Sequence, residues 1–110
     1  MLNQSALLNE LVFVLQENKA LDTITLDVRD QTSVTDYMII TTARSARHVK
    51  AIAEYAKEHM KKHQLRALGT HGLEDAQWVL VDFGDFILHI MQPESRAFYQ
   101  IEDLWQQPHA

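Results

Sequence analysis

The segment 77–92 constrains the fold most, because two apolar runs flank the pair Gly84-Asp85. A glycine followed by a polar residue suits the two-residue loop of a β-hairpin. This loop fixes the register of the two strands, which pairs Phe83 with Phe86, Val81 with Leu88 and Val79 with Ile90. Since side chains alternate across a strand, these six apolar residues share one face, and we predict that this face lies in the core.

The opposite face of the hairpin would carry a mixture of large apolar side chains, one acid and one imidazole: Trp78, Leu80, Asp82, Ile87, His89 and Met91. A wholly buried sheet face does not need that mixture. Tryptophan is favoured at interface hot spots, and exposed apolar patches often mark partner sites. We therefore predict that this face binds a partner. The alternative is that Trp78 is an ordinary core residue and that Asp82 and His89 make turn or cross-strand contacts.

The segments before the hairpin alternate between helical and strand periodicity. Apolar residues recur at helical spacing from Leu7 to Leu15, and the period of two in 24–28 and 36–42 predicts two strands that pair. Ser45 is a suitable N-cap for a long amphipathic helix whose apolar stripe ends at Met60. Residues 65–68 then resemble a short strand, which a helical crossover would set parallel to the second strand.

The segment after the hairpin predicts one last helix. Pro93 is well placed for a helix start, and residues 94–104 would carry Phe98, Ile101 and Leu104 toward the core. Linkers and repeats are absent, so we expect a single α/β domain over residues 1–105, followed by a polar tail over 106–110.

Composition excludes several classes of protein. The 110 residues contain no cysteine, which rules out a disulfide scaffold, a cysteine zinc site and thiol catalysis, and which fits a reducing compartment. No run of about 18 apolar residues occurs, and the amino end does not resemble a signal peptide. We expect a cytoplasmic protein with no membrane contact.

Charge is unevenly distributed along the chain. The formal net charge is -5, yet seven of the ten Lys and Arg residues lie within 44–66. From Glu74 onward the chain has seven acidic residues and one basic residue, Arg96. An acidic half gains little from releasing counterions at phosphates, so a basic protein partner suits it better than nucleic acid. The alternative is that both halves are solvated surface.

Several motifs occur in one order along the chain: Val34-Thr35-Asp36-Tyr37, Ser45-Ala46-Arg47-His48-Val49, Gly72-Leu73, Trp78-Val79-Leu80-Val81-Asp82-Phe83-Gly84-Asp85, His89, Arg96, Tyr99 and Leu104-Trp105. With their spacings, they resemble the ribosomal silencing factor (Iojap-like) family from about residue 19 to residue 105. The chain departs from the usual family pattern at Ala43, where glycine is common, and at His71.

The resemblance implies a mixed sheet of about five strands in a nucleotidyltransferase-like fold without the catalytic residues. It implies a translational repressor that binds a basic protein of the large ribosomal subunit at the intersubunit face and blocks joining of the small subunit. Neither a cofactor nor catalysis is expected. Arg96 and Tyr99 on the last helix would face the same way, and they either border the partner site or pin the helix to the sheet.

Three alternatives accompany this interpretation. Arg44, Arg47 and Lys50, at the start of the long helix, would make a minor contact with ribosomal RNA phosphates or remain solvated. A homodimer formed through the Trp78 face would exist off the ribosome. A nucleotide-binding enzyme is the third, but the sequence has no Gly-Ser phosphate turn and no Asp-x-Asp pair for Mg²⁺.

Two histidine patterns contain residue types that occur in metal or catalytic sites. His59 and His63 stand four apart on a helix, but no third ligand is evident in the sequence, which favours a solvated basic helix face and no metal. Asp36, His48 and His89 contain the residue types of a catalytic site without any spacing that brings them together, so we predict no triad.

Overall fold

The structure, a computed structural model, describes residues 2–106. The helices are α1 (Gln4–Glu17), α2 (Ala46–Lys62), α3 (Pro93–Tyr99) and α4 (Ile101–Gln106). The strands are β1 (Leu21–Asp27), β2 (Tyr37–Thr42), β3 (Gly69–His71), β4 (Trp78–Asp82) and β5 (Phe86–Met91). Within the described part of the chain, no helix is long and apolar enough to cross a bilayer.

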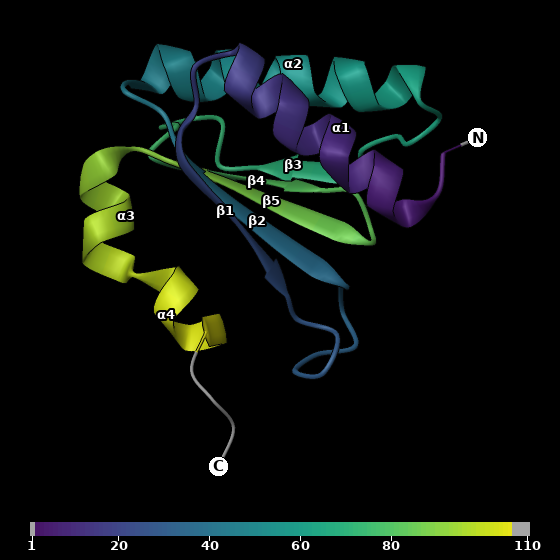
Figure 1. The fold of residues 1–110 in the computed structure, drawn as a ribbon. Coiled ribbons are helices and arrows are strands. Elements are labelled where there is room, and N and C mark those ends of the chain that lie inside the picture. The colour runs from purple at the N-terminus through teal and green to yellow at the C-terminus, as the bar shows by residue number, and fades with distance from the viewer. Residues whose placement is uncertain (1, 107–110) are drawn as a thin grey trace.

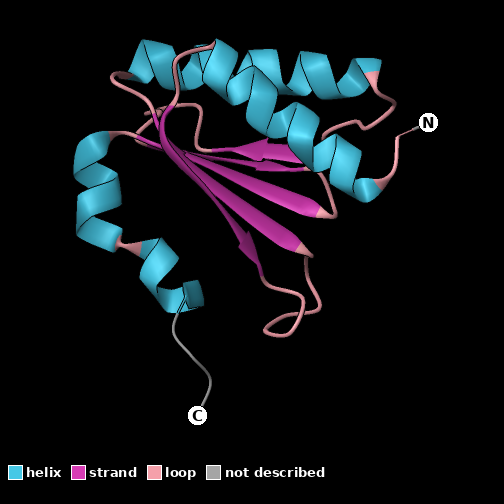
Figure 2. Ribbon diagram, viewed as in Figure 1, coloured by secondary structure: helices cyan, strands magenta, loops and turns pink. Residues whose placement is uncertain are grey.

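The strands form one mixed sheet in the order β1-β2-β5-β4-β3, in which β2 and β5 run parallel and every other neighbouring pair is antiparallel. Helices α1 and α2 cover one face of this sheet, and α3 and α4 lie on the other face (Figures 1 and 2). The predicted α/β fold with a mixed sheet of about five strands is confirmed.

The main core lies between the sheet and the helices α1 and α2. The predicted hairpin supplies its centre: Val79 pairs with Ile90, Val81 pairs with Leu88, and all four side chains are completely buried. The Phe83 N–H donates to the Phe86 carbonyl at 2.8 Å, so the two-residue loop forms as predicted. From the helices, buried side chains meet this face: Leu11, Leu15, Val49, Ile52, Ala53, Ala56 and Met60.

The turn into α2 also forms as the sequence predicts. The Ser45 hydroxyl accepts the His48 N–H at 3.1 Å and thereby caps the helix. Ala43 is completely buried and does not take a positive φ. This turn therefore does not require glycine.

The predicted strand 65–68, parallel to the second strand, is wrong. The third strand is β3, which pairs antiparallel with β4 at the edge of the sheet, while β5 takes the place beside β2. The physical reason is burial: that central position requires a strand covered on both faces, and Leu68 is 74% exposed. Residues 65–68 connect α2 to β3 without forming a strand.

The single helix predicted over 94–104 is also wrong, because Gln100 takes a left-handed conformation (φ 47°) and separates α3 from α4. A left-handed residue ends the helical periodicity, so positions counted across it no longer share a face. Only Ile101 of the three predicted core residues is buried, whereas Phe98 is 81% exposed and Leu104 is also exposed. Of the predicted tail, Gln106 ends α4, and residues 107–110 lie outside the described part of the chain.

Candidate functional site

The second face of the sheet is only partly covered. Helix α4 contacts β1 and α3 contacts β5, and together they close a small apolar cluster: Leu26, Val28, Met38, Ile40, Met91 and Ile101. Toward β4 and β3 this cover ends. We call the partly exposed surface formed by Trp78, Leu80, Asp82 and Ile87, together with the buried His89 between them, the open face.

The strand register brings the predicted partner-binding residues onto this one face. Asp82 lies opposite Ile87, Leu80 opposite His89, and Trp78 opposite Met91. The predicted shared face of the hairpin is therefore confirmed. Leu80, Asp82, Ile87 and Trp78 are half-buried. Met91 is completely buried in the apolar cluster under α3 and α4, so, contrary to the sequence-based expectation, it is not exposed to a partner.

Trp78 is held in place by two aromatic neighbours. Its indole Nε1–H donates to Nδ1 of His89 at 3.0 Å, which leaves the imidazole proton on Nε2. The Tyr99 ring of α3 lies against Trp78 with the ring centroids 5.0 Å apart. A shallow hollow beside this pair is lined by Gln77, Gln92, Glu94, Ser95, Phe98 and Tyr99.

His89 is a neutral component of the face. It is 6% exposed, and burial lowers its pKa to about 4. Because an exposed imidazole titrates near 6.5, His89 carries no charge at neutral pH. Its contribution to this face is the hydrogen bond that it accepts from Trp78, and its burial argues against the predicted direct contact with a basic partner.

Asp82 makes the turn contact that was the alternative to a partner role. Its Oδ1 accepts the Gly84 N–H at 2.8 Å, so the carboxylate helps to close the hairpin. The side chain nevertheless remains half-buried at the border of the open face. A turn contact and a charged contact with a basic partner are compatible, since a carboxylate has two oxygens.

Arg96 and Tyr99 do not face the same way, contrary to the sequence-based expectation. The Arg96 guanidinium donates from Nη1 to the Asp22 carbonyl (2.6 Å) and to Oγ1 of Thr42 (2.9 Å), and from Nε to Glu102 (3.3 Å). Its side chain is 13% exposed. Arg96 therefore pins α3 to the β1–β2 edge, whereas Tyr99 borders the open face.

Phe98 was missed as a surface residue by the sequence reasoning. Its ring lies against Tyr99, 5.0 Å between centroids, and extends the aromatic row of Trp78 and Tyr99 away from the sheet. The exposure of Phe98 follows from the left-handed conformation of Gln100. Glycine or asparagine at position 100 would have indicated such a conformation, but glutamine does not.

Gly72 explains part of the Gly72-Leu73 motif. Its φ is 94°, and a Cβ at this position would collide with the backbone carbonyl of Trp78. Only glycine allows the loop before β4 to pass this close to the first residue of the open face. His71 lies opposite Leu80 at the sheet edge and is exposed.

The basic residues at the start of α2 lie away from the open face. Arg44, Arg47 and Lys50 are all exposed. His48 is fixed beside them, since Nδ1 accepts the Arg44 N–H at 3.0 Å and Nε2 then donates to the Asn18 carbonyl at 2.8 Å. Any contact of this corner with RNA remains a prediction.

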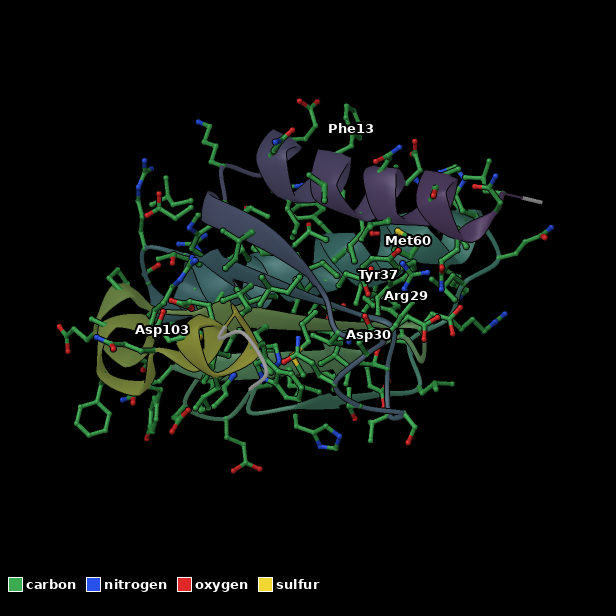
Figure 3. The ribbon with its side chains drawn as sticks, turned by 60° about the horizontal axis from the view of Figure 1, so that its bottom comes forward. Phe13, Arg29, Asp30, Tyr37, Met60 and Asp103 are labelled. Atoms are coloured by element: carbon green, nitrogen blue, oxygen red, sulfur yellow. The ribbon has the colours of Figure 1, made fainter. Side chains whose placement is uncertain are left out.

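The three residues with catalytic side-chain types each have a separate partner. Asp36 accepts from the Gln4 amide at 2.7 Å, His48 bridges Arg44 and Asn18, and His89 accepts from Trp78, so these three do not assemble into a triad. Asp27 is paired with Arg29, whose hydrogen bonds lower the pKa of that carboxyl to about 2. Arg29 also lies over the Tyr37 ring, 5.3 Å from its centroid (Figure 3).

His59 and His63 are only partly solvated, since 22% and 30% of their side chains are exposed. Both rings contact Glu10 of α1, with Nε2–Oε1 distances of 2.9 Å for His59 and 3.1 Å for His63. Sequence spacing does not reveal Glu10 as a neighbour, because it lies on another helix, 49 positions away from His59.

Comparison with known proteins agrees with this architecture. The family model described as "Ribosomal silencing factor during starvation" matches residues 2–110. The ribosomal silencing factor RsfS of Haemophilus influenzae is 41% identical over 100 residues, which cover 91% of this chain and 98% of that protein. A crystal structure of a Chromobacterium violaceum protein superposes with a TM-score of 0.92 at 35% identity and covers 98% of this chain and 92% of that one.

A more distant relative is the mouse protein named "Mitochondrial assembly of ribosomal large subunit protein 1". It is 33% identical over 98 residues, which cover 86% of this chain but 43% of the mouse protein. The similarity therefore extends over one domain of a longer chain. From the family match over residues 2–110, together with relatives that align over nearly their whole length, the chain belongs to the ribosomal silencing factor family.

Proposed function

We propose that this protein binds the large ribosomal subunit through a basic ribosomal protein at the intersubunit face, and that it sterically blocks joining of the small subunit. The observation that carries the proposal is the open face, an apolar sheet surface that α3 and α4 leave uncovered in a chain of this family. The role requires binding without turnover, so it needs neither a cofactor nor a catalytic residue.

The chemistry of the open face suits a basic partner with an apolar centre. Leu80, Ile87 and Trp78 offer half-buried apolar area, and Asp82 lies beside them. Interfaces commonly combine an apolar centre with charged residues that set orientation and association rate. The acidic excess after Glu74 has the sign that attracts such a partner.

Trp78 is preorganised for binding. Its hydrogen bond to His89 and its packing against Tyr99 fix the indole before any partner arrives. A side chain that is already ordered loses less conformational entropy on association, which costs about 0.5–1.5 kcal/mol for each side chain that must be immobilised. This supports Trp78 as the anchor of the interface.

The basic corner at Arg44, Arg47 and Lys50 would add a minor contact to ribosomal RNA. These residues are exposed and flank the N-terminus of α2, where backbone N–H groups favour phosphate oxygens. The mouse relative is named for assembly of the mitochondrial large ribosomal subunit, which agrees with the large subunit as the partner. Action on ribosomes would locate this chain in the cytoplasm.

Co-sedimentation with separated ribosomal subunits tests the proposal. Wild type should sediment with the large subunit and not with the small one, and Leu80→Arg should lose this binding because it brings a cation against a basic partner. The matched control is Tyr55→Arg, which adds the same charge at an exposed position on the helical side. Trp78→Ala should also weaken binding.

A joining assay completes the test. Large subunits preincubated with wild type should recombine less with small subunits than those preincubated with Leu80→Arg. If wild type binds neither subunit, or if Leu80→Arg and Tyr55→Arg bind equally well, the proposal fails. Gel filtration of both variants over a range of concentrations distinguishes loss of ribosome binding from loss of a homodimer formed through the same face.

A further inference from the structure

A cluster of metal-ligating side chains lies on the helical side of the domain, away from the open face. It consists of Glu10 from the middle of α1, His59 from the last turn of α2, and His63, the C-cap residue of α2. Their nearest ligand atoms all lie within 4.8 Å of one another. No step of the proposed ribosome binding uses these residues.

The packing of the two helices brings the three residues together. Leu11 and Leu15 of α1 and Met60 of α2 are completely buried beneath them, which fixes the two backbones at this crossing. His59 and His63 are one helical turn apart and therefore lie on the same side of α2. Figure 3 shows Met60 where α1 and α2 meet and Phe13 projecting from α1 away from the sheet.

The side chains are partly shielded from solvent. The exposed fractions are 34% for Glu10, 22% for His59 and 30% for His63. The rings of His59 and His63 meet edge to face, 5.0 Å between centroids, and Phe13 lies against His59 at 6.1 Å. The donor atoms thus keep their positions while one side of the cluster stays open to solvent.

We propose that Glu10, His59 and His63 form a binding site for a divalent transition-metal ion, of which Zn²⁺ is the best match. Two imidazole nitrogens and one carboxylate oxygen are a usual three-ligand protein set for Zn²⁺, with a fourth position left for water. The set contains too few oxygens for Ca²⁺ or Mg²⁺, which prefer sites built from carboxylates and carbonyls.

Two of the three donor separations fit this assignment with a small adjustment, and the third, between the two imidazoles, lies within 4.8 Å. In a tetrahedral Zn²⁺ site with bonds of about 2.0–2.1 Å, neighbouring donor atoms lie roughly 3.3 Å apart. The two Nε2–Oε1 separations, 2.9 Å and 3.1 Å, are shorter by only a few tenths of an ångström. Small rotations of side chains that are already aligned would accommodate the ion.

The local charge is mixed. The C-terminal end of α2 carries a partial negative charge that favours a cation, as does the Glu10 carboxylate. Lys61 and Lys62 oppose a cation, but both are exposed, and solvent and salt screen their effect. The bound ion would clamp the carboxyl-terminal end of α2 to the middle of α1.

Calorimetric titration of ZnCl₂ into the untagged, full-length protein, together with thermal unfolding with and without Zn²⁺, tests this site. One Zn²⁺ should bind per chain, and Zn²⁺ should raise the melting temperature. Glu10→Gln and His63→Gln should weaken Zn²⁺ binding by at least about tenfold, because each removes one of three ligands. They should also abolish the rise in melting temperature.

The matched controls are Glu58→Gln, an exposed acid beside His59 in sequence, and His71→Gln, an exposed histidine at the sheet edge. Both should bind Zn²⁺ as wild type does. Circular dichroism without metal verifies that each variant is folded, so that only the effect of Zn²⁺ is compared. No binding by folded wild type would overturn the site, and so would equal binding by folded Glu10→Gln and wild type. Neither result bears on ribosome binding.

Discussion

Lowering the pH should destabilise the protein through His89. The pKa of this buried imidazole is lowered to about 4, while the same group in the unfolded chain titrates near 6.5. Between these values the unfolded chain binds a proton that the folded chain does not. The free energy of unfolding therefore increases with pH between these two values. The protein becomes less stable as the pH falls from about 6.5 toward about 4.

The magnitude follows from the two pKa values. One pKa unit corresponds to about 1.4 kcal/mol, so the full difference corresponds to about 3 kcal/mol. At about pH 7 the imidazole is mostly neutral in both states, whereas at about pH 5 it is mostly protonated in the unfolded chain only. The loss of stability between these two pH values should be about 2 kcal/mol. This is a substantial part of the stability of a small domain.

The assay is urea unfolding at several pH values, followed by circular dichroism, for wild type and His89→Asn. Asparagine removes the titrating group, while its side-chain oxygen offers an acceptor near the position of Nδ1 for the Trp78 N–H. Groups that titrate in both proteins cancel in the comparison. The variant should lose about 2 kcal/mol less than wild type between about pH 7 and about pH 5. Parallel pH profiles for the two proteins would refute this reasoning.

Three substitutions test the backbone and the α3 anchor by urea unfolding at neutral pH. Gly72→Ala should cost about 2 kcal/mol or more, because its Cβ collides with the Trp78 carbonyl, and a loss below about 0.5 kcal/mol would contradict the close approach. Gln100→Gly should add about 0.5 kcal/mol by relieving the left-handed conformation, and a loss would argue against that conformation. Arg96→Ala should cost about 2 kcal/mol, because it leaves the half-buried Glu102 without its cation; unchanged stability would contradict the pinning role.

The hairpin and the long helix could be predicted because their determinants are local. A Gly84-Asp85 loop fixes the register of the strands that it joins, and register alone decides which residues share a face with Trp78. Ser45 likewise needs only the residues that follow it to cap α2. In both places, residues only a few positions apart in the sequence determine the local geometry.

The errors arose where position depends on the rest of the fold. Residues 65–68 have a strand-like composition, but which strand lies beside β2 is decided by competition, and the longer, more apolar β5 takes the place. The break between α3 and α4 occurs at Gln100, and glutamine rarely adopts a left-handed conformation. The periodicity of the apolar residues therefore predicts a helix that continues through this position. Glu10 approaches His59 only because two helices pack, which no single-segment pattern can reveal.

The open face owes its exposure to residues outside it. If α3 and α4 formed one continuous helix, the periodicity would direct Phe98 and Leu104 toward the sheet and cover more of it. Instead, Gln100 turns the chain, and Arg96 bonds α3 to Asp22 and Thr42 at the opposite edge. The cover is thereby held over β5 and β1, and it ends toward β4 and β3. Selection for an uncovered binding surface can therefore act on Arg96 and on the α3–α4 junction as well as on Trp78.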